Sequence, residues 1–386
     1  MASTMQLVTT LKIVSESPNN TLEKMGEEFC AKYIKWLCLH MIFNLLLCSK
    51  PQLVTCTIIK SLPGFPGSLP FKLETGYIGV DEKEDVQLFY YFVESERNPR
   101  DDPLMLWLTG GPTCSGLSGL AFEIGPMKFN MVEYNGSLPT FVINPYSWTK
   151  VSSIIFVDAP IGTGFSYSRS SEGSGDTFFV NHIYSFVKKV LKPEAYQKSI
   201  SKVIYLGTHR QILILMQIQG FHLPIALHLY QMNSTSQQKR VCRGLYTGIN
   251  QSNKQCAMDL QAFSVDYKNL LIHVWVNDDN VQKALHVHNR IFWMRCNSSS
   301  LPYRRYFQSV VSYHLSLNTR GYRALIYSGD HDMLIPYLGT LAWIRSLNFT
   351  VVHLWRPWLG GGHTAPEYKP KECFAMFKRW ISQDPL

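Results

Sequence analysis

Residues 104–123 read LMLWLTGGPTCSGLSGLAFE, and the predicted architecture is built outward from this stretch. Leu104 to Leu108 form a short apolar run of the kind that fills a fully buried strand. The Gly-rich residues 109–112 then make a tight turn, and a helix is expected in the small-residue stretch that follows. A buried strand that passes through a glycine turn into a helix is typical of an α/β sheet with its chemistry on loops at the strand ends.

Further short apolar runs predict the other strands of this sheet, at residues 89–93, 153–157, 203–206, 324–327 and 349–355. Helical patterns occur at residues 177–191 and 373–381. Buried strands that alternate with helices predict a mostly parallel sheet covered by helices on both faces. Residues 61–70 (SLPGFPGSLP) are rich in Gly and Pro, so we expect one folded domain over residues 61–386, preceded by an N-terminal extension 1–60.

The composition is that of an ordinary soluble globular protein, and its charge pattern argues against a nucleic-acid binder. The chain has 386 residues, of which 46% are hydrophobic and 17% charged. Its net charge of +9 is scattered, in runs no longer than pairs such as Lys188-Lys189, so we expect no nucleic-acid partner. No CxxC or Cys/His spacing suggests a zinc or redox site, and we expect no metal and no cofactor.

An apolar segment near the N-terminus suggests entry into the secretory pathway. Residues 36–48 (WLCLHMIFNLLLC) are too short to span a bilayer but suit the core of a signal peptide. Because such a core normally lies nearer the start, we expect translation to begin at Met25 or Met41, or residues 1–24 to come from an incorrect gene model. A buried helix is the alternative.

Asn-x-Ser/Thr sequons, which matter only in the secretory pathway, give candidate glycosylation sites. They stand at Asn135, Asn233, Asn250, Asn297 and Asn348, with a further sequon at Asn19 in the extension. We therefore expect an extracellular or vacuolar protein with no stable membrane span.

Two residues near the C-terminus stand in the order of the last two members of a Ser–Asp–His triad. Asp332 follows the predicted strand 324–327, and His363 lies on a Gly-rich loop. Taken singly, Asp332 would be a turn-capping residue and His363 a surface-loop histidine. The motifs around them are more specific.

Long compound motifs in this chain closely resemble those of plant serine carboxypeptidase-like proteins. They are PGFPGSLPFKLETGYIGV (63–80), WLTGGPTCSGLSGLAFEIGP (107–126), NPYSWTKVSSIIFVDAPIGTGFSYS (144–168), YSGDHDMLIP (327–336) and GGGHTAPEYKP (360–370). The resemblance covers about residues 60–205 and 240–386. It implies an α/β-hydrolase fold with a cap insertion, and acyl-enzyme chemistry on a peptide or a small-molecule ester.

The resemblance also implies the roles of the site residues. Asp332 would orient the imidazole of His363, which would act as general base and then as general acid. The backbone N–H of Gly111 would help to form the oxyanion hole. The places at which the family's peptidases bind the terminal carboxylate of the substrate are held here by Thr109, Gly110 and Glu123.

Thr109 departs from the peptidase pattern, which has Asn at that place. It resembles the family members that transfer acyl groups from glucose esters, and so favours the acyltransferase side of the family. The cysteines resemble half-cystines of two family disulfides, Cys114–Cys296 and Cys242–Cys256, whereas Cys373 is expected to be a buried free thiol.

The nucleophile of the family has no counterpart at the matching place. The family carries its Ser in a Gly-Asp/Glu-Ser-Tyr-x-Gly elbow after the strand that matches residues 203–206. Here the residues at those places are Gly207, Thr208, His209 and Arg210. Arg210 stands where the Ser should be, and an arginine stays protonated and cannot attack a carbonyl. We therefore expect little or no activity from this chain.

Three further departures accompany this loss. Residues 211–230 replace a helix, a strand and part of the cap, so the cap region, about 208–270, would be truncated. The family's hairpin and strand after Trp358 are missing. Thr113 stands where the family has Gly, and it would be strained if that site needs a positive φ. The gaps resemble skipped exons, and the alternatives to an enzyme are a non-catalytic secreted glycoprotein that binds a ligand and a truncated gene product.

Overall fold

The computed structural model describes residues 55–81, 85–169, 174–190, 204–207, 225–227, 264–298, 300–307, 309–332, 335–351 and 361–384. Several predictions fall on residues outside these ranges. They are the signal-peptide-like segment 36–48, His209 and Arg210, the Cys242–Cys256 disulfide, and the sequons at Asn19, Asn233 and Asn250.

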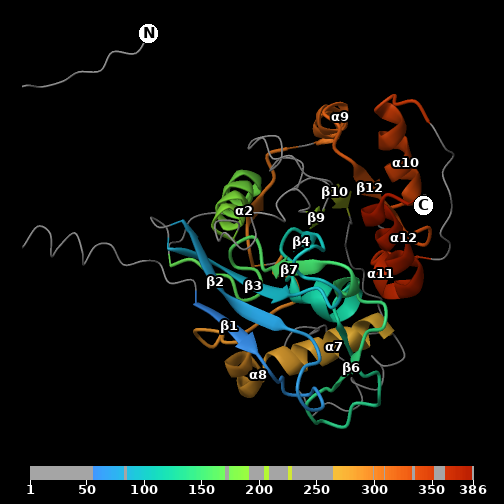
Figure 1. Cartoon of the computed structure of the whole chain (residues 1–386). Helices are drawn as coiled ribbons and strands as arrows, with labels where there is room; N and C mark the ends of the chain where they lie inside the picture. The colour runs from blue at the N-terminus through green and yellow to red at the C-terminus, as the bar shows by residue number, and fades with distance from the viewer. Residues whose placement is uncertain are drawn as a thin grey trace, which may run out of the picture. The chain divides into compact units, whose positions relative to one another are not determined.

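A mixed eight-stranded sheet forms the centre of the described structure, in the order β1-β2-β3-β7-β4-β9-β10-β12 (Figure 1). The strands are β1 (Thr55–Ile59), β2 (Leu73–Asp81), β3 (Val86–Val93), β4 (Leu104–Leu108), β7 (Ser153–Val157), β9 (Ile204–Gly207), β10 (Ile225–Leu227) and β12 (Ala324–Ile326). The pairs from β1 to β7 are antiparallel, and those from β7 to β12 are parallel. The predicted α/β sheet is confirmed, with its parallel part as expected and an antiparallel part added at the N-terminal side.

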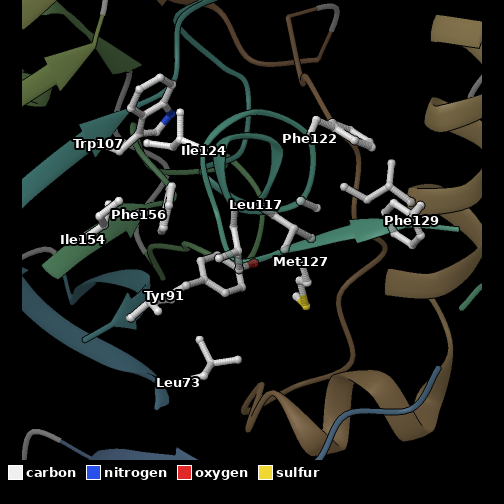
Figure 2. Packing of buried hydrophobic residues seen from close by; sticks show 14 of the residues in the cluster. Leu73, Tyr91, Trp107, Leu117, Phe122, Ile124, Met127, Phe129, Ile154 and Phe156 are labelled. Atoms are coloured by element: carbon white, nitrogen blue, oxygen red, sulfur yellow. The ribbon is translucent and has the colours of Figure 1, made fainter. Parts of the chain in front are cut away.

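The central strands are buried on both faces, and their alternating side chains fill two separate cores. In β3, Phe89 and Tyr91 belong to one core, whereas Leu88 and Tyr90 belong to the other. In β4, Trp107 belongs to the same core as Phe89 and Tyr91. Figure 2 shows the first core, in which Tyr91, Trp107, Ile154 and Phe156 face Leu117, Phe122 and Phe129.

Helices contribute side chains to each core, as the sequence predicted. The first core takes residues of α7 (Ser264–Val276), α8 (Asp279–Ala284) and α12 (Pro370–Ser382). The second takes residues of α2 (Asp176–Val190) and α9 (Val311–Thr319). Figure 1 shows α2 and α7 on opposite sides of the sheet. The predicted helices 177–191 and 373–381 correspond to α2 and α12.

Local sequence signals mark several helix ends. Asp278 caps α8, because its side chain accepts hydrogen bonds from the N–H groups of Asn280 and Val281. Pro370 opens α12, and Gln383 ends it in the left-handed conformation. In α2, Asp176 lies in the first turn and two lysines in the last, where their charges complement the helix dipole.

Shorter elements complete the described part of the chain. They are the π-helix η1 (Gly119–Glu123), β5 (Met127–Phe129), β6 (Phe141–Ile143), the 3₁₀-helix η2 (Trp148–Lys150), β8 (Ser174–Gly175), β11 (Tyr303–Arg304), α10 (Tyr337–Ser346) and α11 (Ala365–Tyr368). The helix expected after the glycine turn is therefore present, and η1 forms its π-helical part.

The predicted strand 349–355 is wrong in the part that the structure describes. Residues 349–351 form no strand, and the side chains of Phe349 and Val351 are exposed rather than buried. Apolar character alone cannot separate a buried strand from an exposed segment. The rest of this prediction, residues 352–355, lies outside the described residues.

Phe377 tests the packing of α12 on the first core. Its ring stacks on Trp148 of η2 with centroids 4.1 Å apart, and both side chains are buried. We expect Phe377→Ala to lower the free energy of unfolding by about 3–5 kcal/mol, because it removes a large buried ring and leaves a cavity. Urea unfolding measures this loss. Phe349→Ala, at an exposed ring, is the control and should change stability by less than about 0.5 kcal/mol; equal losses in both variants would contradict the assigned packing.

Candidate active site

Two loops bring Asp332 and His363 into contact. The first follows β12, and the second leads into α11. His363 Nδ1 lies 2.5 Å from Asp332 Oδ2, and the second oxygen of Asp332 accepts a hydrogen bond of 3.0 Å from the N–H of Ile335. The Asp332 side chain is only 4% exposed. The structure thus places together the two residues for which the sequence predicted a catalytic pair.

A close approach of the two loops makes this contact possible. A Cβ atom at Gly329 would lie 2.1 Å from the carbonyl oxygen of Gly362, so only glycine fits there. The N–H of His331 donates to the carbonyl oxygen of Gly361 across the same contact, at 3.1 Å. Asp330 is exposed, so Asp332 is the acid of this turn that reaches the imidazole.

The surroundings of His363 keep its imidazole neutral at pH 7. Burial lowers the pKa of His363, the hydrogen bond to Asp332 opposes that shift, and the positive charge of Arg295 adds to it. A neutral imidazole whose Nδ1–H is held by a carboxylate can accept a proton at Nε2. This is the state that a general base requires.

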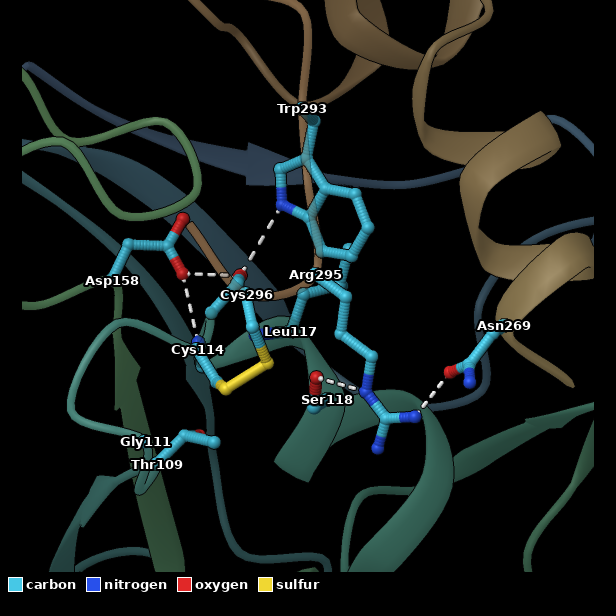
Figure 3. Close-up of a disulfide and its surroundings, with 12 residues drawn as sticks. Thr109, Gly111, Cys114, Leu117, Ser118, Asp158, Asn269, Trp293, Arg295 and Cys296 are labelled. Atoms are coloured by element: carbon cyan, nitrogen blue, oxygen red, sulfur yellow. Dashed lines mark hydrogen bonds between the residues drawn. A yellow bond between two sulfur atoms is a disulfide. The ribbon is translucent and has the colours of Figure 1, made fainter. Parts of the chain in front are cut away.

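The glycine turn after β4 carries the residues that the resemblance assigned to substrate and oxyanion binding. Thr109 is buried, and its hydroxyl oxygen accepts a hydrogen bond of 3.2 Å from Trp107 Nε1. Gly110 is buried and Gly111 exposed. Gly111 has φ +120°, and a Cβ atom there would lie 2.8 Å from Cys114 Sγ (Figure 3). The turn therefore needs glycine at this position.

Thr113 does not show the strain that a positive φ would have caused. It is absent from the described non-glycine residues with positive φ, which are Asp85, His286, Asn348 and Gln383. Threonine at this position instead carries a desolvation penalty, because its hydroxyl is buried with no hydrogen-bond partner among the described residues.

A disulfide joins the glycine turn to the segment before α9. It links Cys114 to Cys296, which lie 182 residues apart, and it is the pair that the resemblance implied (Figure 3). Cys373 is a buried free cysteine, as predicted, and burial raises the pKa of its thiol to about 12.

Asp158 holds the residues that follow the glycine turn, a role that was not predicted from the sequence. This fully buried residue follows β7, and its carboxylate accepts hydrogen bonds from Ser115 Oγ (2.5 Å), the N–H of Gly116 (2.8 Å) and the N–H of Phe165 (2.9 Å). Trp293 Nε1 donates to the same Ser115 hydroxyl at 3.3 Å. Burial raises the pKa of Asp158 to about 6, although these hydrogen bonds lower it. An acid directly after a buried strand was the available signal.

Glu123, predicted to bind the substrate, is a buried carboxyl group at the end of η1. Burial raises its pKa to about 8, the charge of Glu367 adds to this shift, and Arg295 opposes it. Glu123 is therefore mostly protonated at pH 7 and can donate a hydrogen bond.

Arg295 interacts electrostatically with both Glu123 and His363. It was not among the site residues predicted from the sequence. Its guanidinium lies 4.8 Å from the ring centroid of Phe122, its Nε donates to Ser118 Oγ, and its Nη1 donates to Asn269 Oδ1 (Figure 3). Its charge lowers the pKa of both Glu123 and His363. Its place next to a half-cystine fixes it beside the glycine turn.

Three of the predicted glycosylation sites lie in described residues. Asn135 is exposed, and its side-chain oxygen accepts hydrogen bonds from the N–H and hydroxyl of Ser137. Asn297 Nδ2 donates to the carbonyl oxygen of Gly162 at 2.9 Å. Asn348 is exposed with φ +55°. Glycosylation itself stays a prediction at all three.

The described residues contain neither a candidate metal site nor a candidate membrane-spanning helix. No group of three or more His, Cys, Asp or Glu side chains in those ranges is placed to hold a metal ion. No helix there has both the length and the apolar character needed to cross a bilayer.

Comparisons with known proteins agree on one family. The family model of the serine carboxypeptidases matches residues 63–209 and 210–360. Serine carboxypeptidase-like 7 from Arabidopsis thaliana is 40% identical over 431 aligned residues, which cover 90% of this chain and 98% of the relative. Serine carboxypeptidase-like 11 from the same plant is 37% identical, with 91% and 100% covered.

A solved structure of a carboxypeptidase shares the fold. It is a prohormone-processing carboxypeptidase from Saccharomyces cerevisiae, with a TM-score of 0.59 at 15% identity, covering 84% of this chain and 94% of that chain. The match supports the predicted α/β-hydrolase fold.

The raised pKa of Glu123 predicts a dependence of stability on pH. The carboxyl keeps its proton up to about pH 8 in the folded state but releases it from about pH 4.5 when unfolded. Stability is therefore highest at low pH and falls as the pH rises between these values. Glu123→Gln cannot ionise at this position. Its free energy of unfolding should therefore rise relative to that of the wild type by roughly 2–4 kcal/mol as the pH increases from 5 to 8.

Urea unfolding of both proteins at several pH values between 5 and 8 measures this difference. The exposed Glu133 supplies the matched control, Glu133→Gln, whose stability should run parallel to that of the wild type. A constant difference between Glu123→Gln and the wild type would show that Glu123 is ionised at neutral pH.

Proposed function

The chain belongs to the serine carboxypeptidase family, and we propose that its site binds a peptide or a small-molecule ester at the family's acyl-transfer centre without forming a covalent acyl-enzyme. The observation that carries the proposal is the contact between His363 and Asp332, combined with the arginine that the sequence has at the place of the nucleophile. The acid–base half of the machinery is assembled, whereas the attacking hydroxyl has no counterpart there.

Asp332, His363 and Gly111 can interact with the carbonyl group of a bound peptide or ester. Asp332 orients His363 and stabilises its positive charge when the imidazole takes up a proton. The N–H of Gly111 donates to the carbonyl oxygen of the bound ligand, at the place where the family stabilises an oxyanion. Burial of His363 and Asp332 strengthens these interactions, because a site shielded from water screens charge less.

The binding residues favour the acyltransferase side of the family. Thr109 has a single hydroxyl proton to donate, and its oxygen accepts a hydrogen bond from Trp107 Nε1, whereas the Asn of the peptidases would offer two amide protons. Glu123, protonated at pH 7, can donate to an ester or carboxyl oxygen. We propose a small-molecule ester as the ligand on the basis of Thr109, with a peptide as the alternative.

Two features of the comparisons support the loss of the nucleophile. The family match is divided between residues 209 and 210, which is where the elbow should lie. The alignment with Serine carboxypeptidase-like 7 has 431 positions, more than the 386 residues of this chain, so the relative has residues without a counterpart here. Loss of the triad Ser removes covalent catalysis and leaves only ligand binding and oxyanion stabilisation.

The missing serine elbow also favours a second candidate, an active serine enzyme whose gene model has lost exons. Sequencing of long transcripts across codons 195–245 and 350–365 separates the two. A transcript that encodes a Gly-Asp-Ser-Tyr elbow would make this chain an incomplete version of an active enzyme. A transcript that reads as given would leave the binding protein as the function.

We also propose the secretory pathway as the location. The Cys114–Cys296 disulfide is typical of proteins from oxidising compartments, and the exposed sequon at Asn135 is accessible to a glycan. A shift in electrophoretic mobility after treatment with an N-glycosidase would support this location; an unmodified chain recovered from the cytosol would refute it.

A fluorophosphonate probe tests the absence of covalent catalysis. We expect no stoichiometric labelling of any serine, because no hydroxyl stands at the matching place for His363 to activate. Labelling should equal the background of the His363→Ala variant, while thermal unfolding of the unlabelled chain remains cooperative. Stoichiometric labelling that disappears in His363→Ala would overturn the proposal, and a chain without a cooperative transition would support the truncated product instead.

A further inference from the structure

Glu367 is a buried carboxylate that lies four residues after His363, on α11. Its side chain is 6% exposed and forms an ion pair of 2.8 Å with Lys268 Nζ. Its other oxygen accepts a hydrogen bond of 2.8 Å from the hydroxyl of Thr364, the residue directly after the histidine. Since Lys268 belongs to α7, Glu367 ties the histidine loop to a helix of the first core.

Buried Ala365 and Pro366 pack α11 against the rest of the domain, and Glu367 adds polar contacts to this short helix. It has only four residues, and an isolated helix of one turn is unstable in water. Its N-cap residue Thr364 makes no side-chain hydrogen bond to the free backbone N–H groups of the first turn. The Thr364 hydroxyl is instead engaged by Glu367. The side-chain contacts of Glu367 therefore tie this turn to Thr364 and to α7.

Residues of α11 hold both chain neighbours of His363. On one side, the ring of Tyr368 lies over Gly362, where a Cβ atom would come within 2.8 Å of it. On the other side, Glu367 holds Thr364, which is 2% exposed. The direction of the imidazole therefore depends on where α11 sits.

We infer that Glu367 is a positioning residue, whose ion pair with Lys268 and hydrogen bond from Thr364 hold His363 in contact with Asp332. The inference rests on the proposed function for the role of His363. Loss of the Glu367 carboxylate leaves the partly buried Lys268 without this counter-charge and frees the Thr364 hydroxyl. The histidine loop then gains freedom to move away from Asp332.

The proton between His363 Nδ1 and Asp332 gives a signal that reports this contact directly. A histidine N–H in a short hydrogen bond to a buried carboxylate resonates far downfield in the proton spectrum and exchanges slowly with water. Asp332→Asn assigns the resonance by removing it. We expect Glu367→Ala to broaden or remove the signal, or to raise its exchange rate with water by about tenfold or more.

Glu372 offers a matched control on the following helix. It is exposed and lies five residues after Glu367, so Glu372→Ala removes a carboxylate of the same kind and should leave the resonance unchanged. If Glu367→Ala does not unfold cooperatively, Glu367→Gln takes its place. This variant keeps the side-chain volume and an oxygen for Thr364 but loses the ion pair.

The outcomes separate the inference from the proposed function. An unchanged resonance and exchange rate in Glu367→Ala, or in its Gln replacement, would overturn the positioning role. Failure of Asp332→Asn to remove any downfield resonance would instead refute the His363–Asp332 pair on which the proposed function depends. Equal effects of Glu367→Ala and Glu372→Ala would also overturn the inference, because the response would then be a general effect of charge.

Discussion

Burial of the central strands on both faces is the constraint that organises the rest of the molecule. Strands β3, β4 and β7 send alternate side chains into two apolar cores, and every residue of β4 and of the middle of β7 is apolar. Polar chemistry is therefore confined to the strand ends. Thr109 follows β4, Asp158 follows β7, and the turn with Asp332 follows β12. The sheet supplies a rigid base on which these loops meet.

The loops in turn depend on each other through a small number of buried polar contacts. Asp158 holds the segment after the β4 turn by accepting hydrogen bonds from Ser115 and Gly116, and the disulfide ties Cys114 of the same segment to Cys296. Arg295 stands at this junction and acts on both Glu123 and His363 by its charge. A change at any one of these groups will be felt at the others, because charges in a site of low dielectric constant interact strongly.

The sequence was sufficient to predict β3, β4 and β7, since continuous apolar runs bounded by turn residues have few other uses. It missed β2, in which Gly and polar residues interrupt the apolar run although most of the strand is buried. It failed at residues 349–351, where similar residues are exposed. The pairing of Asp332 with His363 was reached through compound motifs, and the Cys114–Cys296 disulfide through resemblance. Asp158, Arg295 and Glu367 were missed in these roles because each acts through partners far away in the chain. Glu367, for example, meets Lys268 across 99 residues, a contact that no local pattern encodes.

The disulfide has a consequence for residues 207–230, one of the regions in which the sequence departs from its family. Cys114 precedes that region and Cys296 follows it, so the covalent link closes a loop around the departure. The entropy of closing a loop changes only with the logarithm of its length, so removal of several tens of residues from such a loop alters this cost by well under ~1 kcal/mol. The disulfide also keeps the residues around Cys114 next to those around Cys296, whatever sequence lies between them. A serine carboxypeptidase scaffold built in this way can lose part of its interior sequence while the groups around the disulfide stay covalently joined.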